Sequence, residues 1–512
     1  MLNTLNISRA AIPRRVLATS AHVLIALTMV LALMHYATGG RVAYTMDSLS
    51  YRDAAINFIA GHPMQVTNVM TQAPERQPLL VWPPAYPALW ASVASLGNAD
   101  IDDVPSLLNP VLLGITTLTI FWVCWMITGR LVIACIVAIM SAFAPPSMIV
   151  YGHAWSETLF IPLLLLAYAA FWKYRISREK FIWLAAAAIF IGIANWVRYA
   201  GVAFLPILGF SVLAASGAVL GKRILHAIGA TLLSVALVSP LWFRNWQLAG
   251  NISGSTRGGV AGSDRWIQDT ATIFDLFEHS LFAFSYMLRA NLEIPLILAA
   301  IFVAIGVFRR NGVRWLSPPE IWLPIIWLTG YLLFFIYARM IQKGIDLDMR
   351  TLAVAFPFLL LAITPAVSAA FSGRSFELRK ILAIFLLGLL IYSGLNEGDR
   401  TRENYASAGV PEWRSDYVFH YLDLRNTSPD SLALQRVIGQ INPSTIVLTN
   451  YRALYIRYLT GAKVYSPNLD KGCTGWTGSH DDGLILLRSP QLPPWAIDCL
   501  KENPQWRLLR PS

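Results

Sequence analysis

The sequence predicts an α-helical polytopic membrane protein with a small extracytoplasmic α/β domain at its C-terminus, and three observations support this fold class. Only 13% of the 512 residues are charged, whereas soluble domains contain about 25% charged residues. Hydrophobic residues make up 56% of the chain, and the mean hydropathy is +0.52. Apolar stretches long enough to cross a membrane recur between residues 16 and 396.

A helix needs roughly 20 apolar residues to cross the hydrocarbon layer of a bilayer. By this measure we expect about 11 transmembrane helices, although the two stretches between 181 and 217 leave the count open. The predicted spans are 16–36, 105–127, 131–149, 155–172, 181–197, 199–217, 224–243, 291–308, 319–338, 351–371 and 381–396. The first span follows Arg9, Arg14 and Arg15, as in a signal peptide, but its apolar core is too long for one and we interpret it as an anchor.

The basic residues predict the orientation, because short cytoplasmic loops are enriched in Lys and Arg. A cytoplasmic N-terminus places every strongly basic short loop inside, and an odd number of spans then places the C-terminus outside. These loops contain Arg130; Lys173, Arg175, Arg178 and Lys180; Lys222 and Arg223; Arg309, Arg310 and Arg314; Arg374, Arg379 and Lys380. The net charge of +11 therefore does not indicate binding to nucleic acid, because the basic residues lie at the ends of apolar stretches and not along one stripe.

Three long segments are predicted to lie outside the membrane, namely 37–104, 244–290 and the tail 397–512. The first has 68 residues, far more than a connection between two helices needs, and long loops of this kind usually have a function. No internal repeat is evident, which counts against a transporter built from repeats. We therefore expect a transmembrane module at 1–396 and a separate domain at 397–512.

The tail has the pattern of a small α/β unit. We expect helices at 431–441 and 451–460 and strands at Thr445–Thr449 and Gly483–Leu487, which suggests a parallel sheet. A cap or docking module is favoured over a second active site. Cys473 and Cys499 can pair if the tail faces an oxidising compartment.

Asp47 is the first candidate for chemistry, and it begins a predicted amphipathic helix whose Ala54, Ala55, Phe58 and Ile59 are expected to face apolar surroundings. Asp47 also lies where a helix N-cap is expected, and a cap stabilises a helix by roughly 1 kcal/mol. Capping and catalysis both remain open for this residue at this point.

The stretch from Trp82 to Pro87 contains three prolines. It is either a stiff connector or an aromatic wall for a sugar or lipid, with Trp82 and Tyr86 as the contacting rings.

Further along, Glu157 is expected at the outer membrane surface, where an ionisable group is costly and indicates a function. The alternative is a carboxylate that closes a helix end. His153 is expected at the interface and not as a metal ligand, because no second histidine lies near it at ligand spacing.

Three arginines, Arg198, Arg244 and Arg350, are predicted at outer membrane boundaries, where the positive-inside rule disfavours them. Each needs a partner, which is either a carboxylate (Asp346, Asp348 or Glu157) or a bound anion, because guanidinium groups bind phosphate in a bidentate way. Snorkelling to the interface explains any one of them alone.

Taken together, these motifs resemble the GT-C superfamily of glycosyltransferases, and most of all bacterial members of the family-39 type, related to protein O-mannosyltransferases and lipid A aminoarabinose transferases. The resemblance covers about residues 1–395. It rests on the order and membrane placement of Asp47-Ser48-x-x-Tyr51, Pro83-Pro84-x-x-Pro87, Ser156-Glu157, Arg198-x-x-Gly201, Pro240 through Arg244-Asn245 ahead of Gly250, and Arg350 through Pro357.

The resemblance implies a membrane glycosyltransferase with a sugar donor on a polyprenyl phosphate, such as undecaprenyl phosphate. It implies inverting transfer to a glycan, lipid or protein hydroxyl on the periplasmic side of a bacterial inner membrane. By this resemblance, Asp47 is the catalytic base. Arg244, Arg350 and Arg198 bind the donor phosphate, and a second group of residues contacts the sugar or the acceptor. That group is Glu157, Tyr51, Tyr86, Trp82 and His153.

The sequence also departs from the family pattern. Many relatives have two adjacent acidic residues in the first loop, whereas Ser48 follows Asp47 here and Asp53 is more distant. No cofactor is therefore expected, and a divalent metal is not favoured. Segment 37–104 also contains no lysine to bind the donor phosphate, which leaves Arg76 or the boundary arginines. The alternatives to an enzyme are a lipid-linked sugar transporter or flippase, or a non-catalytic cell-envelope assembly protein that uses the tail for interactions.

Overall fold

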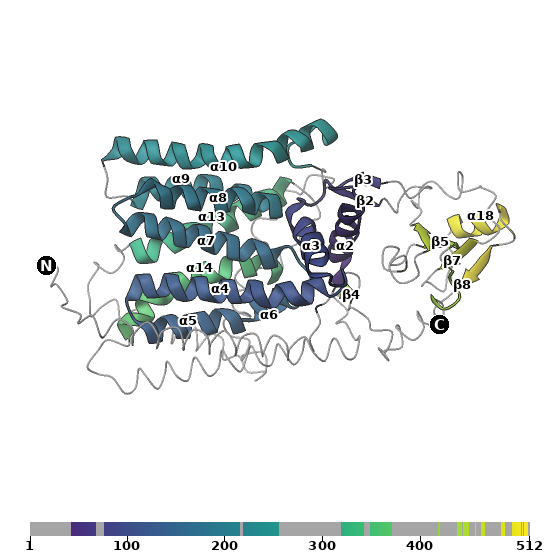
Figure 1. Cartoon of the computed structure of the whole chain (residues 1–512), viewed down its shortest axis with the longest axis horizontal. Helices are drawn as coiled ribbons and strands as arrows, with labels where there is room; N and C mark the ends of the chain where they lie inside the picture. Colours follow the sequence, from purple (N-terminus) through teal and green to yellow (C-terminus); the bar gives the residue numbers. More distant parts are fainter. Residues whose placement is uncertain are drawn as a thin grey trace.

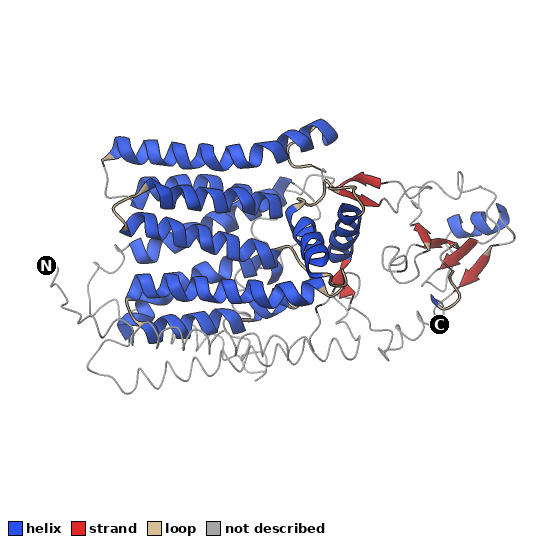
Figure 2. Cartoon of the chain, in the orientation of Figure 1, coloured by secondary structure: helices blue, strands red, loops and turns tan. Residues whose placement is uncertain are grey.

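The computed structural model describes residues 42, 44–67, 76–215, 219–254, 319–341 and 349–370. Of the tail it describes 418–419, 438–442, 444–449, 456, 462–465, 483–486, 494–502, 504 and 506–509. Most of these residues are helical, and strands occur in the first loop and in the tail (Figure 2).

Long helices lie side by side and form a bundle, and two shorter helices lie across one of its ends (Figure 1). The helices of the bundle are α4 (Val104–Thr128), α5 (Leu131–Phe143), α6 (Pro145–Tyr151), α7 (Glu157–Ile176), α8 (Phe181–Val197), α9 (Phe204–Ala215), α10 (Leu220–Ala249), α13 (Pro319–Ile341) and α14 (Met349–Ala370). The shorter helices at the end are α2 (Met46–Ile59) and α3 (Ala85–Gly97). Four described helices, α4, α7, α10 and α13, are long and apolar enough to cross a membrane.

Eight of the predicted spans fall on described helices, and 181–197 coincides with α8. Two of the eight differ in detail. The span predicted at 131–149 breaks between α5 and α6, because Ala144 has an extended backbone (ψ 139) ahead of Pro145, and a residue before proline disfavours the helical conformation. The span predicted at 199–217 begins as a 3-10 helix, η1 (Tyr199–Ala203), before α9. Spans 16–36, 291–308 and 381–396 lie outside the described residues, so the count of about 11 stays a prediction.

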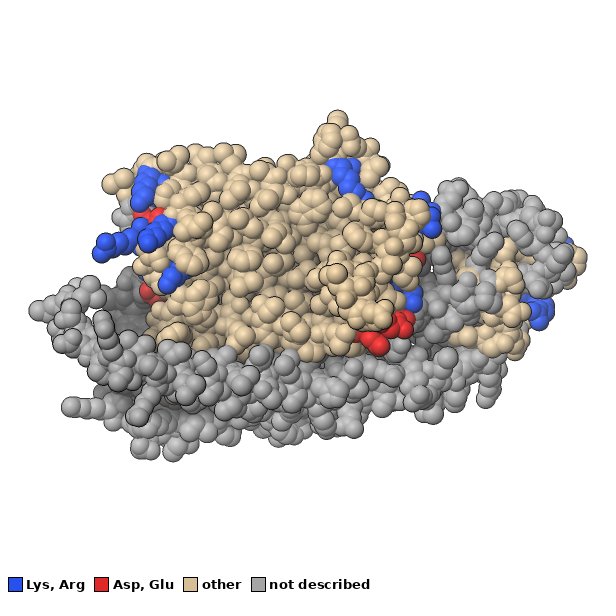
Figure 3. All heavy atoms as spheres, in the orientation of Figure 1, with Lys and Arg blue, Asp and Glu red and all other residues tan. Residues whose placement is uncertain are grey.

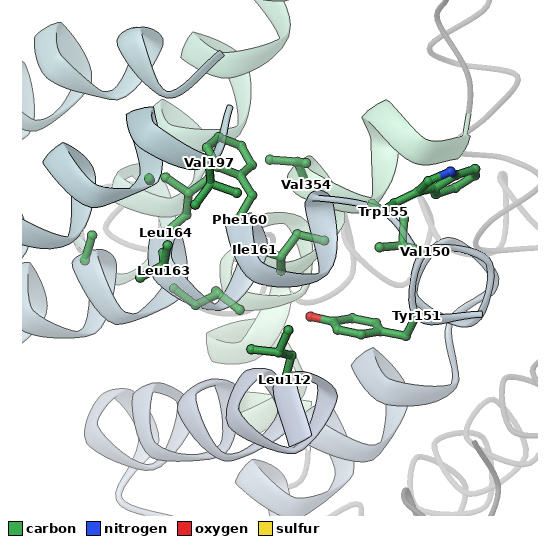
Figure 4. Packing of buried hydrophobic residues seen from close by; sticks show 14 of the residues in the cluster. Leu112, Val150, Tyr151, Trp155, Phe160, Ile161, Leu163, Leu164, Val197 and Val354 are labelled. Atoms are coloured by element: carbon green, nitrogen blue, oxygen red, sulfur yellow. The ribbon is translucent and has the colours of Figure 1, made fainter. Parts of the chain in front are cut away.

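The core of the bundle surrounds α7, which packs against α4, α8 and α14. Phe160, Ile161 and Leu164 of α7 are buried and point among neighbouring helices, with Val197 of α8 and Val354 of α14 close by (Figure 4). The start of α7 is therefore rigidly held, and the residues just before it form part of the site described below.

Charged side chains lie mainly at the two ends of the bundle, and the surface between them is almost free of charge on the face drawn in Figure 3. At the end away from α2, Arg175 pairs with Glu320 at 3.3 Å and Lys222 pairs with Glu179 at 3.5 Å. This distribution is typical of a helical membrane protein.

The first loop folds onto the end of the bundle. Its strands β2 (Gln65–Thr67) and β3 (Arg76–Pro78) form an antiparallel pair. The Asp53 carboxylate accepts hydrogen bonds from the backbone and the hydroxyl of Thr67. The helix predicted from Asp47 is present as α2, with Ala54 and Ala55 buried. Phe58 and Ile59 are exposed at the C-terminal end of α2, so the expectation that they face apolar surroundings stays a prediction.

The tail contains a four-stranded parallel sheet in the order β6-β5-β7-β8, with helix α18 (Pro494–Glu502). Its strands are β5 (Ile446–Thr449), β6 (Lys463–Tyr465), β7 (Gly483–Leu486) and β8 (Arg507–Leu509). Both predicted strands are confirmed as β5 and β7, and they are parallel neighbours.

Other predictions for the tail are only partly covered by the structure. The predicted helices 431–441 and 451–460 lie mostly outside the described residues. Cys499 is disulfide-bonded, while Cys473, its predicted partner, lies outside them. The division into domains at 396/397 stays a prediction. One short strand, β4 (Val418–Phe419), pairs antiparallel with β1 (Tyr44–Thr45) directly before α2.

Candidate active site

Asp47 lies in the first turn of α2, and it does not cap that helix. The N-cap is Thr45, whose Oγ1 accepts a hydrogen bond from the Ser48 amide at 3.5 Å, while the Ser48 hydroxyl accepts one from the Thr45 amide at 3.0 Å. This is a capping box, so the interpretation of Asp47 as the cap is wrong. Ser48 also donates to the Ala154 carbonyl at 2.9 Å, which fixes α2 against the segment before α7. The Asp47 carboxylate is thereby left for other contacts.

Arg350, at the start of α14, binds two carboxylates at once. Its Nη1 donates to Asp47 Oδ2 at 2.7 Å, and its Nε donates to Glu157 Oε1. The guanidinium lies over the Trp155 ring, with 4.5 Å between Cζ and the ring centroid. Its remaining nitrogen, Nη2, is buried and has no hydrogen-bond partner among the described residues. Arg350 therefore joins α2, α7 and α14 and keeps one donor unused.

Glu157 is the most deeply buried acid of this group, with a side chain that is only 1% exposed. It is the first residue of α7, where the helix dipole stabilises negative charge. Arg198 Nη1 pairs with the same Oε1 atom that Arg350 binds. Two guanidinium groups therefore compensate one buried carboxylate. Of the predicted partners for the boundary arginines, Glu157 is confirmed, while Asp346 and Asp348 lie outside the described residues.

Ser156 connects the remaining polar groups. Its Oγ accepts from Arg198 Nη1 at 3.1 Å, donates to Glu157 Oε2 at 3.4 Å and lies 3.1 Å from the Tyr51 hydroxyl. Burial raises the pKa of the Tyr51 phenol well above its ordinary value, and the negative charge of Asp47 raises it further. Tyr51 thus stays protonated and is a hydrogen-bond donor at this site.

Trp155 supports the site from behind Arg350. Its Nε1 donates to Thr45 Oγ1 at 2.9 Å, and its ring stacks on His153 with 4.2 Å between centroids. His153 is itself buried, and its Nδ1 donates to the Ile149 carbonyl at 2.7 Å. His153 therefore lies behind Trp155, in a position that supports the stack.

The predicted aromatic wall forms a cluster with Tyr51. Tyr51 and Tyr86 are fully buried and meet edge to face at 5.2 Å, and the half-buried Trp82 ring lies 5.8 Å from Tyr51. Burial raises the pKa of the Tyr86 phenol. As the chain stands, Trp82 is the member of this cluster with surface to offer to a ligand.

Arg244 has a different set of partners. Its Nη1 donates to the Leu79 carbonyl at 3.0 Å and its Nη2 donates to the Met64 carbonyl at 3.2 Å, both in the first loop. Nearby, Asn245 donates to the Tyr199 hydroxyl at 3.0 Å, and that hydroxyl donates to the Leu80 carbonyl at 3.0 Å. Arg244 and Tyr199, with Asn245 beside them, thus attach residues 64, 79 and 80 to α10 and η1.

The structure thus brings together four predicted charged residues, which are Asp47, Glu157, Arg198 and Arg350, with Tyr51 beside them. Three residues of the site had no predicted role: Thr45, Trp155 and Ser156, of which Ser156 appeared only within the Ser156-Glu157 motif. Threonine is a favoured N-cap residue, but no local signal marks Trp155 as a support for an arginine near residue 350. Among the described residues, no three His, Cys, Asp or Glu side chains come close enough to hold a metal ion.

No protein-family model and no curated protein matches the chain. In its three-dimensional structure, the chain has the fold of the GT-C glycosyltransferases, as the sequence predicted. It is similar to ArnT from Cupriavidus metallidurans bound to undecaprenyl phosphate, with 10% identity and a TM-score of 0.53 over 95% of this chain and 89% of that one.

It is also similar to the oligosaccharyltransferase of Archaeoglobus fulgidus in complex with Zn and sulfate, with 14% identity and a TM-score of 0.52 over 86% of this chain. The chain spans only 62% of the length of that protein. A third similar structure is the mycobacterial arabinofuranosyltransferase AftD, with 14% identity and a TM-score of 0.50 over 83% of this chain and 29% of that one. At identities this low, the structural similarity establishes the fold alone.

Proposed function

We propose that this chain is a membrane glycosyltransferase with Asp47 as its general base. It transfers a sugar from a polyprenyl-phosphate donor to a hydroxyl of a glycan, lipid or protein, with inversion at the anomeric carbon. The ion pair between Asp47 of α2 and Arg350 of α14 is the observation that supports this most directly. It places a carboxylate suited to accept a proton beside a guanidinium suited to bind phosphate, although 303 residues separate them in the chain.

In the proposed reaction the acceptor oxygen attacks the anomeric carbon while its proton passes to Asp47. The bond between that carbon and the phosphate oxygen breaks, and its electron pair goes to the phosphate. General-base catalysis of this kind contributes about 10²–10⁴-fold to a rate. The displacement in one step inverts the configuration, as in inverting sugar hydrolysis with the acceptor in place of water.

The leaving phosphate needs positive charge, and the proposal assigns this role to Arg350 and Arg198. Both guanidinium groups lie beside Glu157, which orients them. Fixed positive charge in a site that excludes water stabilises the charge that develops on the leaving group. A phosphate contact from Arg244 stays a prediction, because its described partners are the loop carbonyls and the Asn245 side chain.

We place the site on the extracytoplasmic side of a bacterial inner membrane, with the N-terminus in the cytoplasm and the tail in the periplasm. The basic loops predict this orientation. The disulfide at Cys499 is in keeping with an oxidising compartment around the tail.

The test is the transfer of labelled sugar from a panel of polyprenyl-phosphate sugars by the purified full chain. Asp47→Asn is expected to lower the transfer rate by about 10²–10⁴-fold, because the amide cannot accept the proton. The matched control is Asp103→Asn, an exposed acid before α4 whose replacement removes the same charge. A well-folded Asp47→Asn protein with near-normal transfer would refute the base assignment. Donor consumption without a membrane gradient separates the enzyme from a lipid-linked sugar flippase.

A further inference from the structure

Arg350 is shared between the proposed base and the proposed phosphate site, and this sharing has a consequence for the order of events. We propose that the donor phosphate displaces Asp47 from Arg350, so that the base becomes free only after the donor has bound. The inference rests on the proposed function and adds to it an obligatory order, with donor before acceptor.

The geometry of the guanidinium group supports this displacement. A planar guanidinium offers an anion two forks, the end-on pair Nη1 and Nη2 and the side-on pair Nε and Nη2. In Arg350, Asp47 occupies Nη1 and Glu157 occupies Nε, while Nη2 is buried and unpaired among the described residues. Because Nη2 belongs to both forks, each carboxylate blocks one of them. A phosphate can take a bidentate position only by displacing Asp47 or Glu157.

Asp47 is the carboxylate that is easier to displace. Its side chain is 25% exposed, whereas that of Glu157 is 1% exposed. Glu157 is also bound by Arg198 and Ser156, whereas Arg350 is the hydrogen-bond and ion-pair partner of Asp47 among the described residues. An arriving phosphate therefore displaces Asp47 and binds Nη1 and Nη2 of Arg350, and the buried ion pairs of Glu157 stay intact.

The charges also balance through a complete reaction. While Asp47 binds Arg350, the guanidinium occupies Oδ2 and the ion pair holds the carboxylate in place, so Asp47 is less available to accept the acceptor proton. After transfer, Asp47 is neutral because it has gained that proton, and it does not compete with the lipid phosphate. Once Asp47 loses the proton to water, its charge returns and it again competes for Arg350, which favours release of the lipid product.

Binding of undecaprenyl phosphate to the purified full chain tests the inference without a sugar or an acceptor. Asp47→Asn is expected to tighten this binding by about tenfold or more, because it removes an anion that competes for the same guanidinium. Asp103→Asn removes the same formal charge and is expected to change the affinity by less than about twofold. In an Arg350→Gln background, Asp47→Asn is expected to give no gain. Asp47→Ala serves as a second variant, with the same expected gain as Asp47→Asn.

The outcomes separate the two ideas. If the lipid binds in an Arg350-dependent way but Asp47→Asn and Asp47→Ala leave the affinity unchanged or weaker, the displacement is wrong and the proposed function stands. If undecaprenyl phosphate does not bind the unaltered chain, or binds equally well without Arg350, both are overturned. A gain of equal size in Asp103→Asn assigns the effect to overall charge and also overturns the displacement.

Discussion

Thr45 offers the sharpest test of how the site is positioned, because one hydroxyl serves two structures. Its Oγ1 caps α2, which presents Asp47, and it accepts the hydrogen bond of Trp155, on which Arg350 lies. Thr45→Val replaces this hydroxyl by a methyl group of similar shape. Thr45→Ser keeps the hydroxyl and is the matched control.

The structure sets the expected loss of stability. Removing a Thr cap costs about 1 kcal/mol, and the buried Trp155 Nε1 left without an acceptor costs about 1–3 kcal/mol. The two losses share one oxygen atom, so their sum of about 2–4 kcal/mol is an upper estimate. Thr45→Ser is expected to cost less than about 0.5 kcal/mol.

Thermal unfolding in detergent and the sugar-transfer assay measure the two consequences separately. For Thr45→Val we expect a lower melting temperature and a lower kcat with a smaller change in KM, because Asp47 and Arg350 lose a common support. Trp155→Phe keeps an aromatic face under Arg350 but removes the indole N–H. When it is combined with Thr45→Val, it is therefore expected to add little to the loss of stability and activity that Thr45→Val causes alone. If the valine and serine variants behave alike in both assays, the shared support is refuted.

Three further predictions concern the surroundings of the site. Burial raises the pKa of Tyr51 above its ordinary value of 10.0. Above about pH 10 the unfolded chain therefore releases a proton that the folded chain keeps, and the stability of the fold falls. Tyr51→Phe should show a smaller fall in melting temperature at alkaline pH, and a fall equal to that of the unaltered chain would contradict this. Gly254 has φ +82 and a Cβ there would overlap the Leu80 carbonyl, whereas Gly250 has φ +70 and open space around it. Gly254→Ala should therefore destabilise the chain beyond the roughly 1 kcal/mol of backbone strain expected for Gly250→Ala. Equal melting temperatures of the two variants would argue against the close approach of Gly254 to the Leu80 carbonyl. Because the two carboxylates of the site already share one guanidinium, transfer should persist in a strong chelator, and loss of activity that Mn²⁺ or Mg²⁺ restores would overturn that view.

The helices of the bundle were predictable because their signal is local. An apolar stretch of about 20 residues is sufficient evidence for a span, and the prediction for 181–197 coincides with α8. The break before α6 was missed although the sequence contains its cause, since Pro145 disfavours a helical Ala144. That local signal was outweighed by the hydrophobicity of the whole stretch.

The site was predictable as a set of residue types but not as a set of contacts. The cost of charge at a membrane boundary singled out Glu157, Arg198 and Arg350. The pairing of Arg350 with Asp47 depends on the packing of α14 against the end of the bundle, and no spacing in the sequence specifies it. The N-cap was assigned two residues too late, because Thr45 competes for that position and its capping box with Ser48 is the better one.

The arrangement of helix ends supports the anionic donor that we propose. Asp47 lies in the first turn of α2, Glu157 is the first residue of α7, and Arg350 is the second residue of α14. Helix N-termini have a partial positive charge, so α2 and α7 stabilise their own carboxylates, and α14 adds positive potential where its own dipole disfavours an arginine. Three helix N-termini and two guanidinium groups therefore face two carboxylates, and the balance is positive. In the proposed reaction, a phosphate with its own negative charge replaces Asp47 at Arg350, and Asp47 is then free to accept a proton.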